Sequence, residues 1–136
     1  MTLRPLLVVA VAALLSSCAG LPAGGGMGGD FACVTAPTVG ATVSSPFRVQ
    51  GSAPGDWYFE AQFDAQLLDG TGRVLDEAPA RAQGDWMTDG SVPFIVDFAY
   101  SSSTVQPATV VLTEDQTGEN QGPPRTVRIS ILLSPS

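Results

Sequence analysis

Apolar and polar side chains alternate at every second position in several segments that follow residue 30. In the segment 59–67, the odd positions hold Phe, Ala, Phe, Ala and Leu, whereas the even positions hold Glu, Gln, Asp and Gln. A period of two is that of a β-strand with one buried and one solvated face, whereas a helix needs a period near 3.6. We therefore expect a strand at 59–67, and we expect no helix after the N-terminal segment.

The same reasoning predicts further strands separated by turns. Alternation predicts strands at 94–100, 108–112 and 126–133, and shorter apolar runs predict strands at 32–35, 47–52 and 73–80. Asp69-Gly70-Thr71-Gly72 is typical of a tight hairpin between two of these strands. Short strands with turns at this spacing predict an all-β fold, an immunoglobulin-like antiparallel β-sandwich of about seven strands. Residues 30–136 suit the roughly 100 residues of such a domain.

The first 17 residues have the pattern of an export signal. Arg4 is followed by an unbroken apolar decad, Leu6 to Leu15, which is too short to span a bilayer as a helix. Leu15-Ser16-Ser17-Cys18 comes next and resembles the lipobox of bacterial lipoproteins, in which the cysteine sulfur forms a thioether to diacylglycerol. This predicts a signal peptide at 1–17 and lipidation of Cys18. The alternative is an ordinary secretory signal cut after Ala19, which would release a soluble protein.

Residues 18–29 are expected to link the lipidated cysteine to the domain. The eleven residues after Cys18 are mostly glycine and alanine, a flexible composition that reaches roughly 18 Å root-mean-square. Cys33 is the only other cysteine. If lipid occupies Cys18, Cys33 has no intramolecular partner, and we expect it to be a small buried side chain rather than part of a disulfide.

Charge and composition exclude several classes of function. After loss of Arg4, five arginines face thirteen acidic residues, so nucleic acid and anionic lipid headgroups would be repelled. Membrane attachment must then come from the covalent anchor. The sequence contains neither lysine nor histidine, which removes imidazole acid–base chemistry, histidine metal ligands and Schiff bases. We expect no catalytic residues, no metal site and no cofactor.

Three groups of side chains are candidate sites. The carboxylate groupings of residues 76–77, 85 with 89, and 114–119 are interpreted as turn chemistry, although a calcium site at 114–120 is kept as a minor alternative. The serine run 101–104 is interpreted as a polar loop. Trp57 and Tyr58 are predicted to be exposed recognition residues at a loop edge, whereas Trp86 is assigned to the core.

The order of features along the chain resembles a known family. Residues Pro37 to Ala53 match the pattern P-x-x-G-x-x-V-x-S-P-x-x-V-x-G-x-A, which opens the immunoglobulin-like domain of bacterial spore germination proteins. Phe59-Glu60-Ala61, Asp69-Gly70, Trp86 and Phe94 then follow in the order of that family. The resemblance covers most of 34–133 and implies an all-β, non-catalytic domain of the cell envelope. It does not imply germination itself, and it carries over no ligand or site residue.

These observations predict a lipid-anchored, extracytoplasmic binding module of the bacterial cell envelope. The expected partners are the membrane, through lipid on Cys18, and an envelope protein or cell-wall component whose identity the sequence does not specify. Ala19, directly after the lipidated cysteine, fits sorting to the outer membrane where there are two membranes. The alternative is a structural or assembly accessory lipoprotein of a larger envelope complex.

Overall fold

The structure is a computed structural model that describes residues 30–117 and 122–136. The predicted signal peptide and linker, residues 1–17 and 18–29, lie outside the described residues. One short 3-10 helix, η3 (Gly55–Trp57), and eight strands form this part of the chain: β1 (Cys33–Ala36), β2 (Thr42–Val43), β3 (Phe47–Pro54), β4 (Gln62–Asp69), β5 (Val74–Ala82), β6 (Ser91–Phe98), β7 (Gln106–Thr113) and β8 (Thr126–Leu133). The predicted all-β class is confirmed, with one strand more than the seven expected.

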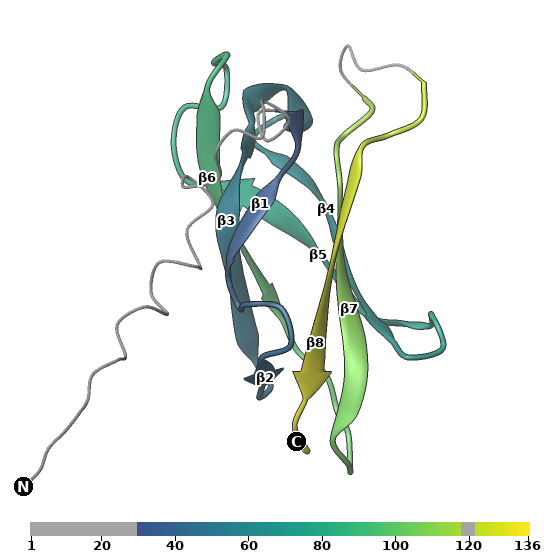
Figure 1. The fold of residues 1–136 in the computed structure, drawn as a ribbon. Coiled ribbons are helices and arrows are strands. Elements are labelled where there is room, and N and C mark those ends of the chain that lie inside the picture. Colours follow the sequence, from purple (N-terminus) through teal and green to yellow (C-terminus); the bar gives the residue numbers. More distant parts are fainter. Residues whose placement is uncertain (1–29, 118–121) are drawn as a thin grey trace, which may run out of the picture.

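The strands form one curled sheet in the order β1-β3-β6-β5-β4-β7-β8-β2. Figure 1 shows β1, β3 and β6 on one side and β4, β7 and β8 on the other, with β5 crossing between the two layers. The two edge strands, β1 and β2, are consecutive in the chain and are connected by residues 37–41. Because this connection is short, the sheet curls so that its two edges lie close together. The result is the two-layered, immunoglobulin-like arrangement that the alternation predicts.

One pair of strands departs from the expected antiparallel pattern. The two-residue strand β2 runs parallel to β8, with Thr42 opposite Leu132 and Val43 opposite Leu133. Backbone bonds from Leu132 N to Ala41 O (2.9 Å) and from Ser134 N to Val43 O (2.8 Å) hold the pair. The prediction missed β2 because a two-residue strand is too short to show a period.

The core lies between the layers and is filled from alternate positions of the strands. Phe63 of β4 stands at its centre, with edge-on ring contacts to Trp57 (5.3 Å between centroids), Tyr58 (5.1 Å) and Phe94 (5.2 Å). Each large side chain removed from water contributes roughly 1.5–3 kcal/mol. The other large, fully buried side chains are Phe98, Leu67, Leu112, Ile131, Leu133, Val49, Val92, Val96 and Val110.

The start of β4 differs from the prediction. Glu60 and Ala61 adopt left-handed backbone conformations (φ 55° and 69°), so the predicted strand 59–67 begins at Gln62. They form a two-residue turn in which Phe59 and Gln62 exchange backbone hydrogen bonds of 2.9 and 3.2 Å. Non-glycine residues seldom adopt positive φ, which is why the alternation through this turn was misleading.

The predicted hairpin at Asp69 is confirmed. It joins β4 to β5, and the Asp69 carboxylate accepts hydrogen bonds from the backbone N–H groups of Thr71 (2.8 Å) and Arg73 (3.0 Å) and from the Thr71 hydroxyl (2.7 Å). These bonds hold the pKa of Asp69 below its usual value. Gly72 has φ +93°, a conformation in which glycine is favoured. The carboxylate therefore has a local role in the turn.

Candidate functional site

The predicted recognition residues, Trp57 and Tyr58, are buried. Their side chains are 0% and 4% exposed, and burial raises the pKa of the Tyr58 phenol. Trp57 Nε1 donates to the carbonyl of Asp30 (3.1 Å), and the Tyr58 hydroxyl donates to that of Val92 (2.7 Å). The expectation of exposure was wrong, because η3 turns both rings inward against Phe63. An exposed aromatic platform is therefore not formed by these two residues.

Trp86 was assigned to the core, and it lies at the edge of it. Its side chain is partly buried, packs against the core cluster and meets Phe59 edge-on at 6.4 Å between centroids. The backbone of this loop also packs closely on η3, because a Cβ added at Gly55 would meet Thr88 O at 2.1 Å and Trp86 O at 2.8 Å. Glycine at position 55 thus lets the loop 83–90 cover the end of the sandwich.

A buried ion pair lies at the end of the domain where β1 and β8 begin. Glu114 is 4% exposed and accepts hydrogen bonds from Arg125 Nε (2.9 Å), Arg125 Nη2 (2.7 Å) and the Arg125 backbone N–H (2.7 Å). The remaining Arg125 nitrogen donates to Asp30 O at 2.8 Å, and Nη2 also reaches Asp56 Oδ1 at 2.8 Å. The guanidinium lies 5.7 Å from the Trp57 ring centroid. We call these residues, Asp30, Asp56, Trp57, Glu114 and Arg125, the Arg125 cluster.

The Arg125 cluster is built to hold the fold. Hydrogen bonding to Glu114 is the largest cause of the raised pKa of Arg125. Both oxygens of Glu114 have donors within 2.9 Å, so the carboxylate is already used. Sequence reasoning missed Arg125 because its partners lie 11, 69 and 95 residues away. The cluster connects Asp30, the first described residue, to η3. It also connects both to the end of β7 and the start of β8, the strands that flank the loop 114–125.

The other acidic groupings do not converge on a site. Asp85 Oδ1 accepts from Met87 N (3.0 Å) and Asp115 Oδ1 from Thr117 N (2.6 Å), which is the expected turn chemistry. Asp64, on the outer face of β4, has a pKa raised by desolvation and then by the charges of Asp115 and Glu77. Within residues 30–117 and 122–136, no group of three His, Cys, Asp or Glu side chains is placed to hold a metal ion. Residues 118–120 of the alternative calcium site at 114–120 lie outside the described residues.

The serine run forms a loop that is tied to the C-terminus. Ser102 N donates to Ser136 O (3.4 Å), Ser136 N donates back to Ser102 O (2.7 Å), and the Ser102 hydroxyl donates to Thr104 O (2.6 Å). Gln106 Nε2 also donates to this hydroxyl at 2.7 Å. The interpretation of 101–104 as a polar loop agrees with these bonds.

Cys33, the first residue of β1, is disulfide-bonded in the structure. This contradicts the expectation that Cys33 has no disulfide partner. The sequence reasoning assigned the sulfur of Cys18, the other cysteine of the chain, to lipid, and so left no partner for Cys33. Cys18 itself lies outside the described residues.

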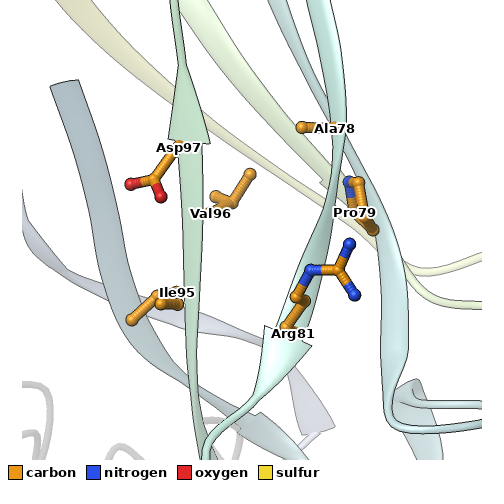
Figure 2. A pocket seen from close by; sticks show the side chains of 6 residues that line it. All are labelled: Ala78, Pro79, Arg81, Ile95, Val96 and Asp97. Carbon is orange, nitrogen blue, oxygen red and sulfur yellow. The ribbon is translucent and has the colours of Figure 1, made fainter. Parts of the chain in front are cut away.

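A cleft opens between β5 and β6, where β5 crosses from one layer to the other. It has a volume of about 220 Å³ and is lined by Ala78, Pro79, Arg81, Ile95, Val96 and Asp97. Figure 2 shows the Asp97 carboxylate on the side of β6 away from β5, and the Arg81 guanidinium on the side of β5 away from β6. That carboxylate forms a two-bonded ion pair with Arg48 of β3 (2.8 and 3.1 Å), which holds the pKa of Asp97 below its usual value. Neither charged group therefore points into the gap between the two strands.

Comparison with known proteins places these observations in a family. The family described as the immunoglobulin-like domain of bacterial spore germination matches residues 31–119. This span includes β1 to β7 and both walls of the cleft between β5 and β6. No curated protein matches the chain. In the described part of the chain, no helix is long and apolar enough to cross a bilayer.

Proposed function

Because the chain belongs to the family of immunoglobulin-like domains of bacterial spore germination, we propose that it is a lipid-anchored interaction module on the extracytoplasmic side of the bacterial cell envelope. Its role is to bind another envelope component, and it is not an enzyme. The family description names germination, but binding at an envelope surface requires no spore.

The cleft between β5 and β6 is the observation that supports a binding function. Four of its six lining residues, Ala78, Pro79, Ile95 and Val96, are apolar, and its volume of about 220 Å³ is below the roughly 300–1,000 Å³ of small-molecule sites. A narrow opening beside a strand suits a segment of another macromolecule better than an enclosed substrate. Loops at the ends of the sandwich add further contact surface.

Lipid attachment is supported by the sequence Leu15-Ser16-Ser17-Cys18, which follows directly on the apolar decad. Two or three acyl chains on Cys18 would anchor the protein stably, whereas a single chain binds only marginally. With an acidic domain, the anchor rather than surface charge holds the protein at the membrane. The proposed lipidated form differs from the structure at Cys33, because a thioether on Cys18 and an intramolecular disulfide to Cys18 would both use the same sulfur atom.

The anchor is tested by expressing the full chain in a bacterium and measuring the mass of its mature N-terminal peptide. We expect cleavage before Cys18, a diacylglyceryl mass on its sulfur and recovery in the membrane fraction. Cys18→Ser should leave the protein unlipidated, whereas the control Cys33→Ser should remain lipidated and in the membrane. Recovery of wild-type protein with an unlipidated Cys18, either as a thiol or in a disulfide with Cys33, would contradict lipid anchoring.

The interaction role is tested by crosslinking the lipidated protein in intact envelopes. A single reproducible adduct on the domain is expected for a binding module. If no adduct forms, while lipidation and folding are normal, the proposed binding function is wrong.

A further inference from the structure

The outer edge of β8 is covered over only part of its length. β2 pairs with β8 at Leu132 and Leu133, and Figure 1 shows β2 only beside the lower end of β8. On its other side, β8 pairs with β7 along its whole length. Among the described residues, the stretch 126–130 therefore has a neighbouring strand on one side only. At 3.3–3.4 Å per residue, this open edge is about 17 Å long.

The hydrogen bonds at the covered end show which backbone groups of β8 face outward. Leu132 N donates to Ala41 O (2.9 Å), and Ser130 O accepts from Gly40 N (2.8 Å). Because alternate residues of a strand direct their N–H and C=O to the same edge, the even-numbered residues of β8 face away from β7. The N–H of Ser130 and both backbone groups of Arg128 thus point outward from this edge. No residue in the described part of the chain bonds to them.

The apolar side chains beneath the open edge are incompletely covered. The odd-numbered residues of β8 point into the sandwich, and Ile131 and Leu133, at the end covered by β2, are 2% and 0% exposed. Val127 and Ile129, beyond the end of β2, pack against the core but are only partly buried. A strand added beside 126–130 would place every second side chain over Val127 and Ile129.

Arg128 lies on the outer face of this edge without an acidic neighbour on β7. Its side chain is exposed, and it forms no ion pair with any described residue. Val111 lies directly opposite it, and Thr109 and Thr113 lie diagonally opposite, so none of the three is charged. Cross-strand neighbours of these kinds are the ones that interact in a sheet. A carboxylate that pairs with Arg128 would therefore come from the open side of β8.

The charge on this edge distinguishes between two kinds of partner strand. β8 contains no acidic residue, and antiparallel pairing with β8 of a second copy, centred on Arg128, would place two arginines opposite each other. Like charges in that position destabilise a strand pair. A foreign strand with Asp or Glu opposite Arg128 would instead form a charge-assisted hydrogen bond there. The edge thus favours an acidic partner over self-association.

We propose that the open edge of β8 binds one extended peptide segment of another envelope component, in which an acidic residue stands between apolar ones. The segment pairs its backbone with Arg128 and Ser130, its carboxylate binds the Arg128 guanidinium, and its apolar side chains cover Val127 and Ile129. Main-chain bonds provide affinity and side chains provide selectivity, as in other cases of strand addition. The proposal deepens the interaction function above, rests on it, and assigns it to a surface other than the β5–β6 cleft.

A display library of random linear heptapeptides, selected on the folded wild-type protein, tests this inference. Peptides with one Asp or Glu flanked by β-branched apolar residues are expected to be enriched. A synthetic copy of such a peptide should shift the amide resonances of Arg128 and Ser130. Arg128→Gln should weaken its binding at least tenfold, which is about 1.4 kcal/mol. The matched control is Arg81→Gln, which should bind as the wild type does. Arg81 is also exposed and has no ion pair within the described chain, but it lies on the interior strand β5.

Ser130→Pro tests the backbone pairing separately from the charge. Proline removes the outward N–H of residue 130 and places its ring on the open edge, whereas the ladder to β7 uses the odd-numbered residues and keeps its bonds. We expect this variant to lose peptide binding while its melting temperature stays close to that of the wild type. Peptide binding equal to that of the wild type would contradict pairing at this edge.

The proposal is also overturned if no acidic peptides are enriched, or if a folded Arg128→Gln, with the melting temperature of the wild type, binds the peptide equally well. Weaker binding by Arg81→Gln alone would place the peptide at the β5–β6 cleft instead. Dimerisation of the wild type that Ser130→Pro abolishes in analytical ultracentrifugation would assign the edge to a second copy. If envelope crosslinking gives the same adduct with Arg128→Gln and wild type, the β8 proposal fails while the interaction function stands. If the wild type gives no adduct, the interaction function itself fails.

Discussion

Arg125→Met is expected to lower the free energy of unfolding by about 3–5 kcal/mol, because it leaves a buried carboxylate without its counter-ion. Glu114 is 4% exposed, and every hydrogen bond described for its carboxylate comes from Arg125. The substitution keeps the backbone N–H of residue 125 but removes the three guanidinium nitrogens, so Asp30 O also loses a donor. In a domain of about 100 residues the melting temperature should fall by roughly 15–25 °C. Urea unfolding and calorimetry measure both quantities.

Arg48→Met is the matched control for this prediction. Arg48 also forms a two-bonded ion pair, but its side chain and that of Asp97 are 53% and 58% exposed. An exposed pair contributes about 0–1 kcal/mol, so this variant should unfold close to the wild type. The double variant Arg125→Met, Glu114→Gln should regain part of the lost stability, because no buried charge remains. If Arg125→Met and Arg48→Met cost the same, burial of Glu114 is not the cause.

Trp57→Ala is expected to cost about 3–5 kcal/mol, the range for truncating a fully buried aromatic side chain. Trp57 is 0% exposed, packs edge-on against Phe63 and donates to Asp30 O. An exposed recognition residue would give a change near zero. Denaturant unfolding therefore distinguishes the buried position from the exposed platform predicted from the sequence.

Two further variants check that assignment. Trp86→Ala removes a ring that is only partly buried and should cost clearly less than Trp57→Ala. Trp57→Phe keeps much of the ring volume but loses the bond to Asp30 O, so its cost should also be smaller. Because Trp57 and Arg125 contact each other and share Asp30 O, their combined effects should not be additive. A negligible loss for Trp57→Ala would contradict the structure of this end of the domain.

The period of two was sufficient to predict most of the strands. The inward positions of β6, Phe94, Val96 and Phe98, are those that the alternation indicated, and they are at most 2% exposed. The hairpin at Asp69 could be predicted because turn chemistry is local. The family could be predicted from the order of motifs along the chain. Where the physical cause is local, the sequence was a reliable guide.

Features that depend on contacts between distant residues were not predictable in this way. Trp57 and Tyr58 follow a Pro-Gly-Asp turn, a composition typical of an exposed loop, yet η3 turns both rings into the core. Glu60 and Ala61 continue the alternation but lie in a turn with positive φ. In each case the residue types fit two conformations, and the packing of the whole domain decides between them.

The cleft illustrates the same limit. Pro79 was predicted only as part of a strand, and the structure shows that it lines a cleft together with Asp97 of the neighbouring strand. Asp76 was noted as a carboxylate beside Glu77, but its two acceptor bonds depend on where β6 ends.

The central claim is that the β5–β6 ladder ends at the pair of Arg81 with Ile95 and that a cleft separates the two strands beyond it. Native-state hydrogen exchange of the free protein, followed by NMR, tests it directly. We predict that the Asp97 amide exchanges rapidly, whereas the amides of Ile95, opposite Arg81, and Val96, opposite Val49, exchange slowly. An Asp97 amide protected as strongly as its two neighbours would show that the ladder continues past Pro79, and the cleft would then not be available to a partner strand.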